Sequence, residues 1–212
     1  MMLSQFQAVG QALFAQGLIS SQGGNLSIKF GEHLVITHRG SALGSIQECD
    51  LVETGISKNN RATPFASTEL EVHRCIYQKT SALAVVHAHP PYAVTLSFTE
   101  KAIIPCDIEG QALLPKVPVL SPKKTKKLGE LANDIARLLK EHRVVLVRGH
   151  GSFAASQLLE EAYYYTTVLE HSCRLLYLLK LLQVNPRPTL CFKKFCPGPV
   201  EGSSGSDSLR GK

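Results

Sequence analysis

Two short apolar runs, each leading into histidine, constrain the fold of this chain more than any other feature. Residues 82–86 read Ala-Leu-Ala-Val-Val and precede His87 and His89, and residues 144–147 read Val-Val-Leu-Val and precede His150. A continuous apolar run of this length is typical of a strand buried on both faces. Alternate residues of a strand share a face, so His87 and His89 should point the same way. If the two strands are neighbours in one sheet, the three imidazoles converge at its rim.

Glu69 adds a carboxylate to these imidazoles. It follows Ser67 and Thr68 at the start of an expected helix, where the helix dipole favours a negative charge. Three neutral nitrogens and one carboxylate oxygen suit a divalent transition metal, most plausibly Zn²⁺, with Mn²⁺ and Co²⁺ as alternatives. Each residue alone has an ordinary structural explanation, and His-x-His is a weak signal by itself. The combination of Glu69 with all three histidines indicates a metal-dependent enzyme in which Glu69 moves a proton.

A second set of residues, all in loops or at the helix start, predicts an anion site. Free N–H groups at the beginning of a helix attract phosphate, and glycine loops let backbone approach it. The candidates are Gly24, Asn25, Arg39, Gly40, Ser67 and Thr68. The first two are equally explained as a turn before a strand. A metal beside a carboxylate and a phosphate pocket suits reversible carbon–carbon cleavage in a phosphorylated keto-sugar, because the ion polarises the ketone and stabilises the developing enediolate.

Composition favours one domain and argues against several partners. The chain has 212 residues, 44% of them hydrophobic, which suits a single core. The net charge of +6 favours an anionic ligand, but the lysines in residues 123–127 are better explained as a solvated helix end, so no nucleic acid is expected. Residues 158–182 carry too many charges for a membrane span. The chain has six cysteines but no C-x-x-C pair, and its first residues do not read as an apolar leader. We therefore expect reduced thiols and a cytoplasmic location, and a redox pair of Cys191 with Cys196 is disfavoured.

Periodicity predicts alternating helices and strands along the chain. Helices are expected at 4–17, 69–79, 91–98, 125–142 and 157–182. Strands are expected at 26–37 (a hairpin turning at residues 31–32), 50–53, 82–86 and 144–147, with short extended pieces in 103–119. Two helix caps are predicted: Thr68, in a capping box with Glu71, and Ser156 before the last helix. The composition of residues 197–212 predicts a disordered tail.

Several of these segments resemble the class II aldolase/adducin family. The matching pieces are residues 22–27, 36–40, 67–69, 85–89 and 149–151, and their order and spacing agree from about residue 3 to residue 182. The resemblance implies an α/β fold with three layers, in which helices flank a mostly antiparallel central β-sheet. This domain would span residues 1–190, followed by a tail at 191–212. The resemblance also implies assembly as a homotetramer.

The resemblance further implies what the site does. Zinc would bind His87, His89, His150 and Glu69, with Glu69 also acting as acid and base, and the six anion-site residues would hold the substrate phosphate. The implied reaction cleaves a ketose 1-phosphate, such as L-fuculose 1-phosphate or a related deoxyketose 1-phosphate, into dihydroxyacetone phosphate and an aldehyde. Alternatives in the family are a methylthioribulose-1-phosphate-type dehydratase, a sugar-acid-phosphate decarboxylase and a ribulose-phosphate 4-epimerase. Epimerases usually carry aspartate at the position of Glu69, and non-catalytic adducin-like interaction modules lack the three histidines.

Two positions depart from the aldolase pattern. Aldolases of the family carry a tyrosine acid in the segment after the His-x-His strand, whereas residues 105–110 here read Pro-Cys-Asp-Ile-Glu-Gly. Another residue must therefore protonate the leaving aldehyde, or the substrate differs. Arg39 replaces the usual threonine or serine of the phosphate loop, and its guanidinium can bind phosphate through two hydrogen bonds.

Overall fold

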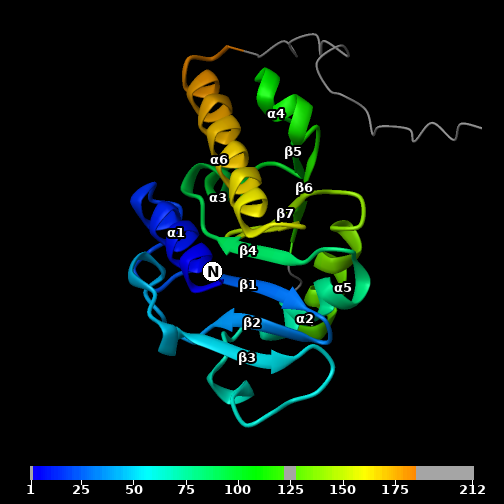
Figure 1. Cartoon of the computed structure of the whole chain (residues 1–212). Coiled ribbons are helices and arrows are strands. Elements are labelled where there is room, and N and C mark those ends of the chain that lie inside the picture. Colours follow the sequence, from blue (N-terminus) through cyan, green and yellow to red (C-terminus); the bar gives the residue numbers. More distant parts are fainter. Residues whose placement is uncertain (1, 122–127, 185–212) are drawn as a thin grey trace, which may run out of the picture.

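A computed structural model describes residues 2–121 and 128–184, and its centre is a single β-sheet (Figure 1). The strands are β1 Asn25–Phe30, β2 His33–Thr37, β3 Leu51–Gly55, β4 Ala84–Ala88, β5 Ala102–Ile103, β6 Val117–Leu120, β7 Val144–Val147 and β8 Gly151–Ser156. Their order in the sheet is β3-β2-β1-β4-β8-β7-β6-β5, and every neighbouring pair is antiparallel except β6 with β7. The mostly antiparallel sheet predicted from the sequence is confirmed.

Helices cover both faces of this sheet. They are α1 Met2–Ala15, α2 Leu70–Lys79, α3 Pro91–Ser97, α4 Ile108–Leu113, α5 Leu128–Leu138 and α6 Leu159–Leu181, with short 3-10 turns at Leu43–Ser45, Glu48–Asp50 and Thr63–Phe65. The apolar side chains of α1, α3 and α6 pack in one core, and those of α2 and α5 pack in a second core on the opposite face (Figure 1). The result is a three-layer α/β fold.

The central strand β4 shows why the sequence folds into layers. All five of its residues are buried. Val86 packs in the core under α1 and α6, whereas Val85 packs in the core under α2 and α5, because successive strand side chains alternate between faces. The prediction of strands buried on both faces is confirmed for residues 84–88 and for β7, which is buried throughout as well, whereas Leu83 precedes β4 and is 40% exposed. His87 follows the alternation and lies on the α2 side, where its ring stacks on Phe153.

Strand β8 was not expected, and it changes how the histidines meet. It pairs with both β4 and β7, so the two apolar strands are not direct neighbours. Every residue of β8 except Phe153 is small (Gly-Ser-Phe-Ala-Ala-Ser), and a strand with one large apolar side chain gives no alternation signal. Ser156 is the last residue of this strand, so its predicted role as a helix cap is wrong. The residue before α6 is Leu158, without a side-chain cap, and the Ser156 hydroxyl instead donates to the Glu161 carboxylate.

The capping box at Thr68 is also wrong. The N-cap of α2 is Glu69, and it makes no side-chain cap hydrogen bond. The Glu69 carboxylate points instead toward the histidines, while Thr68 is exposed. The backbone N–H of Glu69 donates to the Ser67 hydroxyl over 3.3 Å, which satisfies one of the free donors at the helix start.

Other predictions hold or fall outside the described residues. The hairpin at 26–37 is confirmed as β1 and β2, turning at Gly31 with a positive φ of 56°. The tail at 191–212, with Cys191 and Cys196, and the lysines of 123–127 lie outside the described residues. Within residues 2–121 and 128–184, no helix combines the length and apolarity that a membrane crossing requires.

Candidate metal centre

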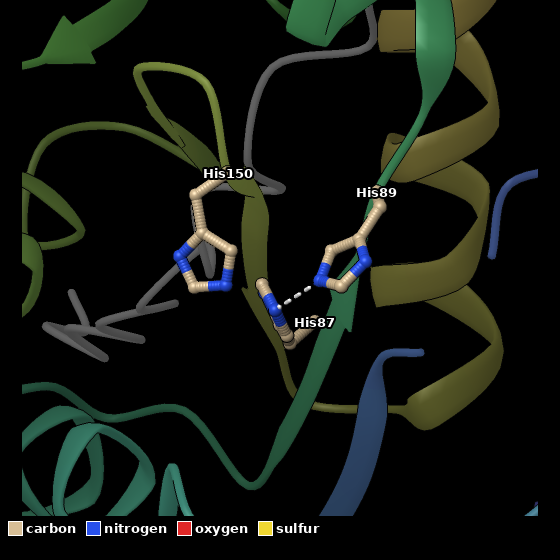
Figure 2. Close-up of side chains that lie close together, drawn as sticks. All are labelled: His87, His89 and His150. Atoms are coloured by element: carbon tan, nitrogen blue, oxygen red, sulfur yellow. Dashed lines mark hydrogen bonds between the residues drawn. The ribbon is translucent and has the colours of Figure 1, made fainter. Parts of the chain in front are cut away.

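Three segments far apart in sequence bring the predicted metal ligands together. His87 lies in β4 and His89 directly follows that strand, while His150 occupies the turn between β7 and β8. Because β8 pairs with β4 in a register that sets Phe153 opposite His87, the turn carrying His150 folds back over the end of β4. Figure 2 shows the three rings turned toward one another, and each offers a nitrogen within 4.8 Å of the other two.

Glu69 completes this group from the start of α2. Its Oε2 lies 3.0 Å from Nε2 of His87, and its Oε1 lies 3.3 Å from Nε2 of His150. The Nε2 atoms of His87 and His89 are 2.9 Å apart. One carboxylate therefore faces two of the three imidazoles, as the sequence predicted for a shared ion.

The hydrogen bonds of His87 show which nitrogen is free to bind a cation. Its Nδ1 lies 2.9 Å from the backbone carbonyl of Ser152, which can only accept, so Nδ1 carries the proton. Nε2 therefore presents a lone pair to the cluster, and a backbone acceptor behind the ring is the usual support of a metal-ligating histidine. Stacking on Phe153, with centroids 4.2 Å apart, fixes the plane of the ring.

Burial keeps the imidazoles of His87 and His89 in the form that binds metals. Burial lowers the pKa of His87 well below its ordinary value, and the neighbouring His89 and His150 lower it further. Burial, followed by the charge of His150, also lowers the pKa of His89. Neutral imidazoles have a free lone pair, whereas protonated ones would have to release a proton before binding a metal.

The donor set fits a divalent cation. The lone pair of His87 Nε2 faces a carboxylate oxygen of Glu69 at 3.0 Å, and two acceptors at this distance repel unless a proton or cation lies between them. Burial raises the pKa of Glu69, while the hydrogen bond from Asn25 and the charge of His150 oppose this rise. A bound cation would favour the carboxylate form still further. Nitrogen and oxygen donors of this kind suit zinc.

The same cluster forms the floor of a pocket, and all ten residues predicted for the site line it. The lining residues are Gln22, Gly23, Gly24, Asn25, His38, Arg39, Gly40, Ser67, Thr68, Glu69, His87, His89 and His150. The exposed Arg39 is tied to the loop before α2, since its guanidinium donates to the backbone carbonyl of Pro64. The anion candidates and the metal candidates thus share one cavity.

Glycines allow the backbone to pass close to the histidines. Gly24 has a positive φ of 76°, and a Cβ there would lie 2.7 Å from the carbonyl oxygen of His87. A Cβ on Gly151 would lie 2.3 Å from the carbonyl oxygen of Ala88 and 2.6 Å from Cδ2 of His89. Any side chain at either position would displace the strand end that carries the ligands.

Three buried polar residues behind Glu69 were not predicted from the sequence. They are Ser27, His73 and Tyr77, and none is more than 2% exposed. The signal that could have revealed them is spacing, because Glu69, His73 and Tyr77 follow one another at intervals of four residues and so share one face of a helix. A polar residue at each step of a buried helix face is unusual enough to mark a site.

Comparison with known proteins shows the family of this chain. The family model described as "Class II Aldolase and Adducin N-terminal domain" matches residues 4–177, and the chain belongs to this family. An L-fuculose phosphate aldolase of Methanococcus maripaludis (strain C5) is 30% identical over 184 residues, covering 86% of this chain and 99% of the relative. A 3-oxo-tetronate 4-phosphate decarboxylase of Pectobacterium atrosepticum is 27% identical, covering 81% of each chain.

Solved structures of known proteins share the fold of this chain. The crystal structure of L-fuculose-1-phosphate aldolase from Thermus thermophilus superposes with a TM-score of 0.81 at 41% identity, covering 85% of this chain and 95% of that one. The named relatives also include a bifunctional protein with methylthioribulose-1-phosphate dehydratase in its name. The family supports a lyase that depends on a metal, and its members differ in substrate and in the bond they break.

Proposed function

We propose that this protein is a zinc-dependent aldolase that cleaves a ketose 1-phosphate, such as L-fuculose 1-phosphate or a related deoxyketose 1-phosphate, into dihydroxyacetone phosphate and an aldehyde. The observation that carries the proposal is the convergence of three imidazoles and the Glu69 carboxylate on the floor of a pocket lined by Arg39, Ser67 and Thr68. This arrangement puts proton transfer and anion binding in one cavity.

The chain's own residues divide the work in this proposal. His87, His89, His150 and Glu69 would hold the zinc ion, which when bound would supply a positive charge that polarises the substrate carbonyl. When the carbon–carbon bond breaks, a base takes the proton of the substrate hydroxyl that becomes the aldehyde oxygen, and the electron pair of the broken bond passes to the carbon next to the ketone. Glu69 returns a proton to that carbon, and in the reverse direction it removes that proton. The raised pKa that burial gives Glu69 favours proton uptake.

The phosphate would bind on the other side of the pocket. Arg39 offers a guanidinium, and the loop before α2 offers the hydroxyls of Ser67 and Thr68. Gly24 and Gly40, both with positive φ, would bring backbone close to the phosphate. The Asn25 side chain uses one N–H on Glu69, and its second N–H remains for the substrate.

The segment where aldolases carry a tyrosine acid bears on the choice of reaction. Asp107 is one of the two acidic residues in 105–110. It caps α4, because its carboxylate accepts a hydrogen bond from the backbone N–H of Gly110 over 2.7 Å. The group that takes the hydroxyl proton in cleavage, and returns it to the aldehyde oxygen in the reverse reaction, is therefore unassigned in this chain. Dehydration of methylthioribulose 1-phosphate is the second candidate, because a relative carries that activity in its name and the same base could remove the proton beside the ketone.

A substrate panel tests the proposal. The purified protein, loaded with zinc, would be offered L-fuculose 1-phosphate, ribulose 1-phosphate, methylthioribulose 1-phosphate, a 3-oxo sugar-acid phosphate and ribulose 5-phosphate. Release of dihydroxyacetone phosphate supports the proposal. Loss of water, loss of CO₂ or epimerisation in its place would assign one of the alternatives. Binding of no zinc and turnover of no substrate would support a non-catalytic interaction module. Light scattering would test the expected homotetramer, and fractionation the expected cytoplasmic location.

A further inference from the structure

A continuous chain of hydrogen bonds runs from Glu69 into the core behind the proposed metal centre. Nδ2 of Asn25 donates to Oε2 of Glu69 over 2.9 Å. The other end of the same amide, Oδ1, lies 2.5 Å from Nε2 of His73. Nδ1 of His73 lies 2.6 Å from the Ser27 hydroxyl, which lies 2.6 Å from the Tyr77 hydroxyl.

Helix and strand geometry explain why these residues interleave. Glu69, His73 and Tyr77 stand four residues apart at and along α2, so each step rises about 6 Å along the helix axis. Asn25 and Ser27 stand two apart in β1, on one face of the strand and about 6.8 Å from each other. The two spacings nearly match, so the helix side chains alternate with the strand side chains.

The direction of every bond follows from the Asn25 amide. Its nitrogen donates to Oε2 of Glu69, and its oxygen, which only accepts, faces Nε2 of His73. Nε2 of His73 must then carry the proton, and Nδ1 must accept from Ser27. Burial lowers the pKa of His73 to about 3, so the ring is neutral and carries a single proton. Burial raises the pKa of Tyr77, so its hydroxyl stays protonated and donates to Ser27.

We propose that Asn25, His73, Ser27 and Tyr77, here called the relay, are positioning residues that hold Oε2 of Glu69 in place, 3.0 Å from Nε2 of His87. The proposed role of the relay rests on the proposed function in one respect, because it takes Glu69 as the group that moves the proton. Without the relay, the backbone position of Glu69 stays the same, but its carboxylate loses the fixed orientation of the Asn25 N–H that donates to Oε2. Buried residues that orient a metal ligand or base in this way typically contribute about 10–100-fold to metal affinity or activity.

The first experiment reads the hydrogen-bond direction without relying on activity. The full chain, with ¹⁵N-labelled histidine, is examined by long-range proton–nitrogen correlation spectra, and His73 is assigned by its absence in His73→Gln. The relay requires His73 to carry its proton on Nε2, and Ser27→Ala, which removes the donor to Nδ1, should shift the Nδ1 resonance. A proton on Nδ1, or a Nδ1 resonance indifferent to Ser27→Ala, would overturn the relay.

The second experiment measures what the relay does for the site. His73→Phe keeps a buried ring and removes both hydrogen bonds, and we expect kcat to fall about 10–100-fold, KM to change less than about threefold, and zinc affinity by chelator competition to weaken about 10–100-fold. His73→Gln can still donate to Asn25 and should recover most of the loss. Tyr77→Phe removes only the outermost hydroxyl and should lower kcat by less than Ser27→Ala does.

A control separates this effect from a general loss of stability. Thr166 is fully buried in α6, where its hydroxyl donates to the Ala162 carbonyl, away from the relay. Thr166→Val also deletes a buried hydroxyl and should leave kcat and zinc affinity unchanged. Folded His73→Phe protein with unchanged kcat and zinc affinity would overturn the positioning role. If His73→Phe does not fold, Ser27→Ala and His73→Gln decide by the same two measurements. Failure of the wild-type protein to bind zinc or to turn over any substrate overturns the proposed function instead, and the His73 spectrum then decides the relay separately.

Discussion

Gly151→Ala should damage the metal centre without touching any ligand side chain. The new Cβ would lie 2.3 Å from the Ala88 carbonyl oxygen, 2.6 Å from Cδ2 of His89 and 3.0 Å from Cε1 of His87. Carbon and oxygen ordinarily approach no closer than about 3.3 Å, so β8 must move away from the end of β4 by about 1 Å. Overpacking of this kind costs about 1–3 kcal/mol of unfolding free energy.

These magnitudes translate into two measurements. For a chain of this size each kcal/mol lowers Tm by about 2–4 °C, so the variant should melt roughly 2–12 °C below the wild-type protein. Because two ligand rings move, zinc affinity by chelator competition should fall about 10–100-fold. Gly129→Ala is the control, since a Cβ on Gly129 meets no atom of the described residues within 4 Å, and it should leave zinc affinity unchanged. Wild-type zinc affinity and Tm in Gly151→Ala would refute the close packing of β8 against the ligands.

Three further substitutions test other parts of the structure. His89→Ala should abolish zinc binding and activity while circular dichroism shows the fold retained, because the His89 side chain is only partly buried; normal turnover would rule out the proposed site. Glu69→Gln should keep the fold and lower the exchange of the proton beside the ketone of dihydroxyacetone phosphate about 10²–10⁴-fold, and exchange at the wild-type rate would exclude Glu69 as the base. Hydrogen bonds from Ser156 and then Tyr165 lower the pKa of Glu161 below its ordinary 4.5. The ionised form therefore stabilises the fold above pH 4.5, and the stability deficit of Glu161→Gln in denaturant titrations should shrink as the pH falls below that value; a deficit independent of pH would contradict this.

The sequence allowed much of the fold to be predicted because its strongest signals are local. Apolar runs marked β4 and β7, and alternation marked the hairpin of β1 and β2. Strand β8 was not predicted because its glycine, serines and alanines carry too little apolar volume to produce an alternating hydrophobic pattern. It is nevertheless the strand that pairs with both β4 and β7. Such a strand is defined by the strands it pairs with, so the hydrophobic pattern of its own residues does not predict it.

The site shows the same division between local and tertiary signals. His87, His89, His150 and Glu69 stood at the ends of patterned segments, and the structure brings them together. Thr68 was wrongly predicted as the helix cap, because α2 begins one residue later, with Glu69 at the N-cap position. His73 was not predicted because a single histidine in a helix gives no signal alone, and its four-residue spacing with Glu69 and Tyr77 was the one pattern in the sequence that could have indicated it.

X-ray absorption at the zinc edge of the purified, zinc-loaded protein, combined with metal analysis, examines the proposed ligand set itself. We expect one zinc per chain, with imidazole nitrogens at about 2.0–2.1 Å and a carboxylate oxygen at about 2.0–2.2 Å. His150→Ala should remove one imidazole from that shell. A shell built from sulfur, a shell unchanged by His150→Ala, or protein that binds no zinc would contradict the metal centre described above.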